Sequence, residues 1–177
     1  MSPCLSPNGV NAYSLAGPPM CLMVGTSSGV VRLERAHSGA PWHIARTKLR
    51  GKHIGALASE PGGLLFAGCH KLGGIYRSAD NGLTWTDITD GVAGTDVFSF
   101  LSLAGEKGFV VFAGTEPVNL YCSDDLGESW RELPAVRCLP GAETWTFPPP
   151  PHIPHVKSMT ADPRSSNSFC ACIAQGA

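Results

Sequence analysis

The sequence lacks the features that mark several large classes of protein. No apolar run approaches the roughly 18 residues needed to span a bilayer, and the first residues contain no basic segment ahead of an apolar one, as a secretory signal requires. Charged residues make up only 15% of the chain and the formal net charge is −1, which gives no general attraction to nucleic acid or to an anionic membrane. We therefore expect a cytoplasmic protein with neither of these partners.

Convincing helical periodicity is absent too, and so are metal-binding spacings. The 21 glycines and 15 prolines separate short β-rich runs, which is typical of the many tight turns of an all-β protein. The seven cysteines form an odd set without CxxC spacing, so we predict no disulfide framework, no metal site and no cofactor. Most of them are expected to be small apolar residues within strands. They are Cys4, Cys21, Cys69, Cys122, Cys138, Cys170 and Cys172.

The chain does contain one short pattern twice, SADNGLTW over residues 78–85 and SDDLGESW over residues 123–130. The aspartate can accept hydrogen bonds from backbone N–H groups two residues further on, the serine can bond to the backbone of the same turn, and the glycine tolerates a positive φ. The tryptophan is expected to begin the returning strand and to cover the hairpin. Each copy therefore predicts a structural hairpin cap, made by Ser78, Asp80, Gly82, Thr84 and Trp85 in the first and by Ser123, Asp125, Gly127, Ser129 and Trp130 in the second.

This pattern belongs to a longer repeat. The spacings are 43 and 45 residues for Trp42, Trp85 and Trp130, and 43 and 46 residues for Gly25, Gly68 and Gly114. A period in the mid-forties with four short strands per unit is the signature of β-propeller blades. One antiparallel blade is predicted from strands at 54–58, 64–68, 74–78 and 84–87, and the next from strands at 97–103, 109–114, 120–123 and 129–133.

The repeat also predicts an incomplete ring. The first unit keeps only Gly39 and Trp42 of the pattern, with His37 in place of the aspartate, so this turn is expected to lack the capping bonds. After the second full copy, 156–161 and 169–173 repeat the first two strands of a blade. Propellers close at about four to eight blades, and about three are present. We expect one partial propeller domain over 1–177, with blade portions 11–47, 53–89, 96–134 and 155–177, that is a fragment of a longer protein or completes its ring by association with another chain.

The paired patterns resemble the Asp-box, or BNR repeat, of sialidases, of sortilin-type receptors and of many bacterial propeller proteins without an assigned activity, also described as WD40/YVTN/BNR-like repeat proteins. The segment WTFPPPPHIPHVKSMTADP, at 145–163, is similar to a segment of bacterial BNR-repeat proteins. In those proteins a basic residue often follows the proline pair, where Pro150 stands here. The resemblance implies a sialidase-like propeller in which the boxes are structural.

Strand order places the expected binding loops on the rim away from the boxes. Within a blade, the turns between the second and third strands and the connections between blades lie on that opposite rim. A long proline-rich inter-blade loop at 134–154 joins it, and long loops on rigid scaffolds are often functional. An aromatic platform beside imidazoles suits a sugar or a peptide, whereas the alternative is an insertion that packs its own aromatics against a blade. The candidate ligand-binding residues are His70, Lys71, Trp145, Phe147, His152 and His155.

The function expected from this organisation is non-catalytic binding or scaffolding, with a glycan or a protein as ligand. The alternative is a fragment of a sialidase-like glycoside hydrolase whose catalytic residues lie mostly outside this chain. The resemblance implies an arginine triad and a tyrosine nucleophile for that activity, but Tyr76 and Tyr121 lie on predicted third strands, where packing explains them. A third hypothesis is an assembly factor of the photosystem-stability type, which acts with a partner complex. We assign no catalytic residue, and we expect Asp87, Asp90 and Asp96 to be exposed acids of an inter-blade turn.

Overall fold

The computed structural model of the chain describes residues 17–174 apart from 61, 62, 72, 93, 106, 107, 163, 166 and 167. Within these residues the chain forms thirteen strands and two short 3-10 helices. All strand pairs are antiparallel. The predicted all-β, antiparallel character is therefore confirmed. No helix in this part of the chain is long and apolar enough to cross a membrane.

The strands form four sheets that follow one another along the chain. Sheet 1 contains β1 (Cys21–Thr26), β2 (Gly29–Glu34) and β3 (His43–Lys48), and sheet 2 contains β4 (His53–Ser59), β5 (Leu65–His70), β6 (Ile75–Ser78) and β7 (Thr86–Asp87). Sheet 3 contains β8 (Asp96–Gly105), β9 (Gly108–Glu116), β10 (Asn119–Ser123) and β11 (Arg131–Glu132). The 3-10 helices η1 (Pro134–Cys138) and η2 (Ala142–Thr144) precede sheet 4, which contains β12 (Val156–Ala161) and β13 (Phe169–Ile173).

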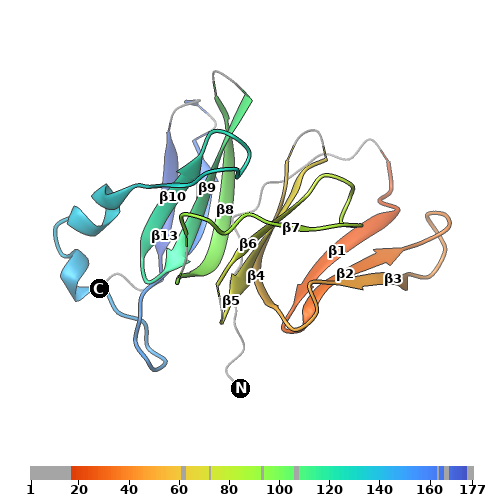
Figure 1. The fold of residues 1–177 in the computed structure, drawn as a ribbon, viewed down its shortest axis with the longest axis horizontal. Coiled ribbons are helices and arrows are strands. Elements are labelled where there is room, and N and C mark those ends of the chain that lie inside the picture. Colours follow the sequence, from red (N-terminus) through yellow and green to blue (C-terminus); the bar gives the residue numbers. More distant parts are fainter. Residues whose placement is uncertain are drawn as a thin grey trace.

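Consecutive sheets pack face to face. Strand β1 contacts β4, strands β4 and β5 contact β8, and strands β8 and β9 contact β12. In Figure 1, sheet 1 lies at the right, sheets 3 and 4 lie at the left, and sheet 2 lies between them. Each interface encloses its own apolar cluster, represented by Ile54 between sheets 1 and 2, by Phe100 between sheets 2 and 3, and by Met159 between sheets 3 and 4. The hydrophobic core is thus a series of layers between sheets.

The glycines that mark the repeat are explained by these interfaces. A Cβ atom on Gly68 of β5 would lie 2.5 Å from Val97 Cγ1 at the start of β8. A Cβ atom on Gly114 of β9 would lie 2.6 Å from Val156 Cγ1 at the start of β12. Gly25 of β1 has the same relation to Ile54 of β4, at 2.9 Å. A side chain at these positions would push neighbouring sheets apart, so the repeated glycine permits their close approach.

The structure corrects two details of the sequence prediction. Trp85 and Trp130 do not begin the returning strands but lie one residue before β7 and β11, because the box turn continues as far as the tryptophan. The cysteines lie mostly within strands, as expected, but few of them are packed in the core. Of those that the structure describes, only Cys69 and Cys122 are buried, whereas Cys21, Cys138, Cys170 and Cys172 are exposed free thiols; Cys4 lies outside the described residues.

Candidate functional site at the histidine rim

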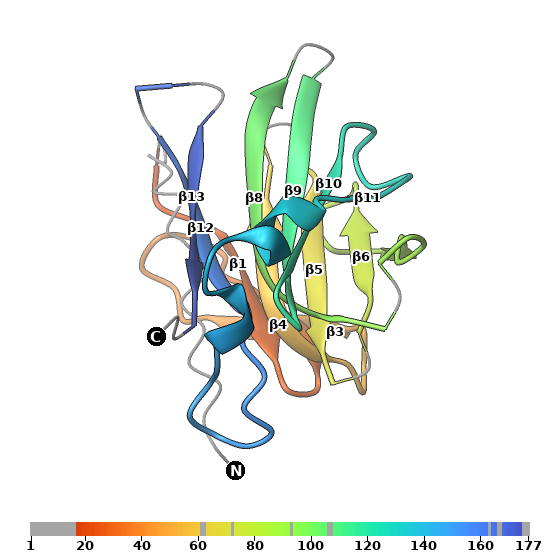
Figure 2. The ribbon, with the colours of Figure 1, turned by 90° about the vertical axis from the view of Figure 1, so that its left-hand side faces the viewer.

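The strand register defines two opposite ends of the sheets. At one end His53 pairs with His70, and Asp96 pairs with Glu116. At the other end Ser59 pairs with Leu65, and Leu65 pairs with Ser78, the first residue of a box. We call the first end the histidine rim and the second the box rim. The turn between β1 and β2 and the proline-rich loop that follows η2 both lie at the lower end of the molecule in Figure 2, which is the histidine rim.

In both boxes a serine and an aspartate hold the turn together. Ser123 Oγ accepts a hydrogen bond from Gly127 N at 2.7 Å and donates one to Asp125 Oδ1 at 2.7 Å. Asp125 also accepts from Ser129 N at 2.9 Å and from Ser129 Oγ at 2.6 Å. Its backbone donor is therefore four residues further along, not two as predicted, because the glycine, with φ of 91°, extends the turn.

The first box repeats this geometry. Ser78 Oγ accepts from Gly82 N at 2.8 Å, and Asp80 Oδ1 accepts from Leu83 N at 3.0 Å and from Thr84 N at 2.8 Å. The Thr84 hydroxyl donates to Asp80 Oδ2 at 2.6 Å. In both boxes the two carboxylate oxygens of the aspartate thus accept hydrogen bonds from their own turn. These bonds within the turn are those of a structural cap.

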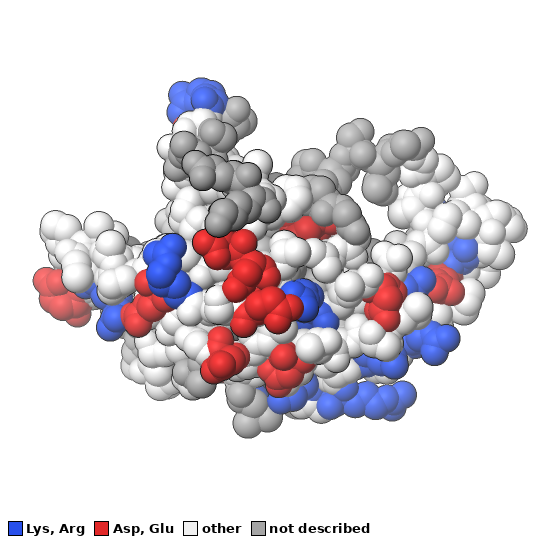
Figure 3. Space-filling model, turned by 45° about the horizontal axis from the view of Figure 1, so that its top comes forward, with Lys and Arg blue, Asp and Glu red and all other residues white. Residues whose placement is uncertain are grey.

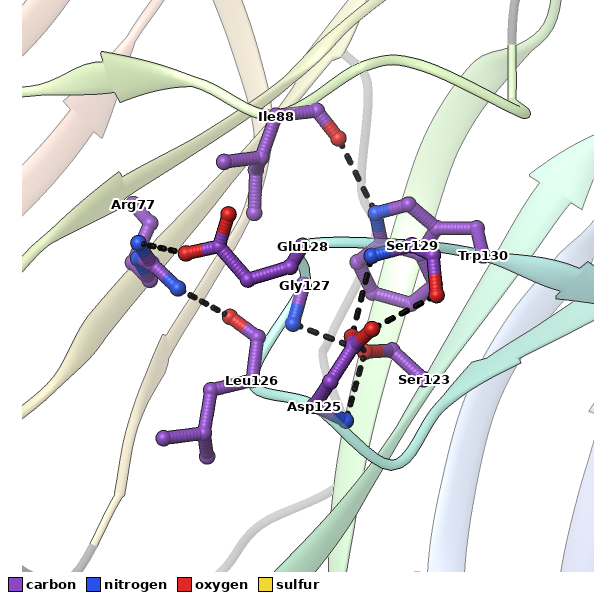
Figure 4. Close-up of polar contacts among 9 residues, drawn as sticks. All are labelled: Arg77, Ile88, Ser123, Asp125, Leu126, Gly127, Glu128, Ser129 and Trp130. Carbon is purple, nitrogen blue, oxygen red and sulfur yellow. Dashed lines mark hydrogen bonds and ion pairs between the residues drawn. The ribbon is translucent and has the colours of Figure 1, made fainter.

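Each box also joins two sheets, as Figure 4 shows for the second box. Arg77 Nη1 on β6 donates to Leu126 O in the second box at 2.8 Å, and Arg77 Nη2 lies 2.6 Å from Glu128 Oε1. The indole nitrogen of Trp130 donates to Ile88 O at 3.0 Å, from sheet 3 back to the end of sheet 2. Arg32 on β2 makes the equivalent bond to Asn81 O in the first box. The boxes therefore connect neighbouring sheets at the box rim.

The hydrogen bonds of the boxes change the acidity of their aspartates. The Thr84 hydroxyl and backbone N–H lower the pKa of Asp80 to about 2. The Ser129 hydroxyl and backbone N–H do the same for Asp125, whose pKa is also about 2. Both carboxylates are fully ionised at neutral pH. Such depressed values mark hydrogen-bonded carboxylates and are unsuited to a general acid at neutral pH.

The turn that replaces a box in sheet 1 uses other contacts. His37 O accepts from Ala40 N at 2.9 Å, and Arg35 Nη1 donates to Ser38 O at 2.6 Å. The Arg35 guanidinium also lies over the ring of Trp42, 4.6 Å from its centroid. This turn therefore relies on an arginine where the two full boxes rely on an aspartate.

The face that includes the box rim carries charges of both signs. In Figure 3, in which the top of Figure 1 is brought forward, acidic side chains gather in the middle of the face and basic ones lie mainly along its lower edge. Asp124 and Glu128 of the second box are among the exposed acidic residues. The charged side chains on this face thus do not produce an electrostatic potential of a single sign.

The histidine rim brings together titratable side chains from three sheets. His70 ends β5 and its Nδ1 lies 2.9 Å from Oδ2 of Asp96, which begins β8. Glu116 ends β9 and its Oε2 lies 3.1 Å from Nδ1 of His155, the residue before β12. One ligand atom from each of His70, Asp96 and Glu116 lies within 4.8 Å of the other two. We call His53, His70, Asp96, Phe98, Glu116 and His155 the rim cluster.

Aromatic contacts hold the imidazoles of the rim cluster in place. The Phe98 ring stacks on His155 with centroids 4.1 Å apart and meets His70 edge-on at 4.9 Å. His53 meets His70, also at 4.9 Å, and Phe147 meets His155 at 4.9 Å. The His155 side chain is only 6% exposed, compared with 17% for His70. The rings thus form a continuous row across sheets 2, 3 and 4.

Burial lowers the pKa of His53, and the neighbouring His70 and Lys71 lower it further. His53 is therefore neutral at pH 7. Asp96 is not the exposed turn acid that the sequence suggested, because its side chain is 22% exposed and packed beside His70. Asp87 and Asp90 are exposed as expected.

The structure brings together some of the predicted ligand-binding residues and separates others. His70 and His155 both contact Phe98, and Phe147 contacts His155. Trp145 is half-buried and packs against the apolar cluster between sheets 3 and 4. Exposed His152 closes the proline-rich turn, with Nδ1 2.9 Å from Phe147 O. Lys71 is exposed beside the cluster, with φ of 56°.

The sequence analysis missed His53, Asp96, Phe98 and Glu116. A signal was present, because these residues stand at or near the first residue of a first strand or the last residue of a second strand in the repeat. Those positions meet at the same rim in antiparallel sheets. No protein-family model matches the chain, and no curated protein matches it. The arrangement of the residues is therefore what bears on function.

Proposed function

We propose that this chain is a non-catalytic binding module of the Asp-box β-propeller type, whose four sheets are successive blades. Two features support the propeller interpretation. The first strands β4, β8 and β12 pack against one another in sequence order, as strands around a common axis do. The same glycine contact and the same arginine-to-box hydrogen bond also recur from one sheet to the next.

The observation that carries the binding function is the convergence of three sheets at the rim cluster. Its partly exposed polar side chains are His70, Asp96 and Glu116, and the rings beside them are fixed by packing. Convergent polar groups on a rigid apolar support are what a specific ligand site requires. The ligand is a glycan or a protein. The box rim has the structural role of connecting neighbouring sheets.

A glycan array probed with the labelled chain tests this proposal. We expect a signal that Glu116→Gln lowers at least about tenfold, since a lost charged hydrogen bond costs roughly 1.5–3 kcal/mol. Glu143→Gln, at an exposed position in η2, is the matched control and should leave the signal unchanged. Equal signals from both variants would place the site elsewhere. The absence of any glycan signal would leave only a protein ligand.

A glycoside hydrolase is the second candidate, and one observation favours it. Carboxylate oxygens of Asp96 and Glu116 lie within 4.8 Å of each other, near the roughly 5 Å separation of the carboxyl pair in retaining glycosidases. Each carboxylate lies beside a histidine, however, and that of Glu116 is hydrogen-bonded to His155, as a structural pair would be. Hydrolysis of any of a panel of fluorogenic glycosides, sialosides among them, that disappears in Asp96→Asn would overturn the non-catalytic proposal.

A partial ring would also associate with another chain through its uncovered sheets. On sheet 1, Leu22 and Ile44 are 46% and 67% exposed. Exposed apolar side chains on an unpaired sheet face favour association. Sedimentation at rising concentrations measures it, and a monomer at all concentrations would argue against it.

A further inference from the structure

The rim cluster contains a buried nitrogen atom whose bonding is incomplete. His70 Nδ1 is shielded from solvent, and among the described residues it has no hydrogen-bond partner. Asp96 Oδ2 is only 2.9 Å away, but the angles do not suit a hydrogen bond. Leaving a buried polar atom unsatisfied costs about 1–3 kcal/mol. A nitrogen and a carboxylate oxygen this close without hydrogen-bond geometry are arranged as two ligands of one cation would be.

The third potential ligand is Glu116. It comes from the strand residue paired with Asp96, so the β8–β9 ladder fixes the separation of the two carboxylates. His155, held by stacking on Phe98, lies 3.1 Å from Glu116 Oε2 and orients that carboxylate. Ligands of metal ions are commonly positioned in this way by hydrogen bonds to outer residues.

The charges and distances of this group suit a divalent ion. Asp96 lies beside His70 and Glu116 beside His155, so in these contacts the two carboxylates face imidazoles and not a lysine or an arginine. Ligand atoms around an ion bound at about 2.0–2.2 Å lie roughly 3–3.5 Å apart. The three ligand atoms now lie within 4.8 Å of one another, so side-chain shifts of about an ångström would bring them to the spacing found around a bound ion. Partial exposure of His70 and Asp96 leaves room for water ligands.

We propose that His70 Nδ1, Asp96 and Glu116 bind a divalent first-row transition metal ion, with His155 as a positioning residue. One imidazole and two carboxylates form a nitrogen and oxygen ligand set that accepts Mn²⁺. Mn²⁺ is also the sharpest probe, because the exposed thiols of Cys170 and Cys172 attract Zn²⁺ but not Mn²⁺. The proposal does not depend on a glycan or protein ligand, since the ion alone is titrated.

The experiment is a titration of the chain with MnCl₂, in which electron paramagnetic resonance counts the free ion. We expect one bound Mn²⁺ per chain, a loss of affinity of at least about tenfold in Asp96→Asn and His70→Gln, and a smaller loss in His155→Gln. Asp124→Asn, an exposed acid at the box rim, is the matched control and should bind as the unchanged chain does. Equal binding by Asp96→Asn and Asp124→Asn, or no binding at millimolar Mn²⁺, overturns the proposal.

A second measurement keeps the test valid if a variant fails to fold. In the unchanged chain, paramagnetic broadening of amide NMR signals by substoichiometric Mn²⁺ should centre on the ends of β5 and β9 and the start of β8. Broadening centred on the box rim would assign the ion to the box carboxylates and overturn the rim site. Failure of the glycan array with success here would refute the glycan ligand and leave the metal site standing.

Discussion

At the scale of single residues, the boxes show how a short motif can specify a turn almost completely. Ser123 and Asp125 satisfy the backbone donors of their own loop, and Ser129 returns two bonds to the same carboxylate. The same hydrogen bonds stabilise the charged form of the aspartate and so hold its pKa at about 2. The hydrogen bonds that hold the shape of the box are therefore the same ones that lower the pKa of its aspartate.

The depressed pKa of Asp125 predicts a pH dependence of folding. Because its folded pKa of about 2 lies below the ordinary 3.8, the stabilisation is complete above about pH 5 and is lost as the pH falls towards 2. Asp125→Asn should be less stable than the unchanged chain at pH 7 and should lose less stability between pH 5 and pH 2. Urea unfolding at each pH measures this. Parallel pH profiles for the two proteins would contradict it.

At the scale of elements, the repeated glycines on β1, β5 and β9 determine how closely sheets pack. Gly68 faces Val97 and Phe100 across the interface of sheets 2 and 3, where a Cβ atom would lie 2.5 Å from the valine and 3.1 Å from the phenylalanine ring. Real Cβ atoms essentially never lie within 3.0 Å of another atom, so the contact with the valine would force a shift, and the contact with the phenylalanine ring would also be tight. The glycine repeats along the sequence because each sheet needs one position without a side chain where the next sheet packs against it.

Replacing Gly68 with alanine should destabilise the fold by roughly 1–3 kcal/mol, the usual cost of overpacking a close interface. Gly39→Ala is the control, because the nearest atom to its Cβ is His37 Nδ1 at 3.8 Å, and it should change stability by less than about 0.5 kcal/mol. Equilibrium unfolding of both variants measures the difference. Equal stabilities would show that the sheets can separate at no cost.

At the scale of the whole molecule, stability is distributed unevenly between the sheets. Sheets 2 and 3 are packed on both faces, whereas sheets 1 and 4 have one packed face in the part of the chain that the structure describes. Strands β5 and β9 are hydrogen-bonded on both sides, but within the described residues β13 pairs only with β12. Sheets 2 and 3 should therefore be the last to unfold.

Hydrogen exchange measures this distribution directly. We expect amides of β5 and β9 to exchange with the rate of global unfolding and amides of β13 to exchange at least about tenfold faster, because local opening of sheet 4 exposes less apolar surface. Mass spectrometry of peptic fragments resolves these strands. Uniform protection from β1 to β13 would mean that all four sheets open as one unit.

Much of the fold could be predicted from the sequence, because the repeat carries the same information several times. The predicted strands at 156–161 and 169–173 coincide with β12 and β13. Those predicted after the boxes were too long, because the turn retains the tryptophan. Trp145 was proposed as a binding platform, but its indole packs against the apolar cluster between sheets 3 and 4. Whether an aromatic residue faces solvent depends on neighbours that are distant along the chain.

The sequence by itself determined the local structure: the turns, the strand positions and the period of the repeat, since these depend on backbone conformation and on hydrogen bonds between near neighbours. Only the tertiary structure decided the rim cluster. His70, Asp96, Glu116 and His155 are separated by many residues, and no motif joins them. They meet because first strands start and second strands end at one rim, and because the close packing of sheets at Gly68 and Gly114 brings those ends within contact.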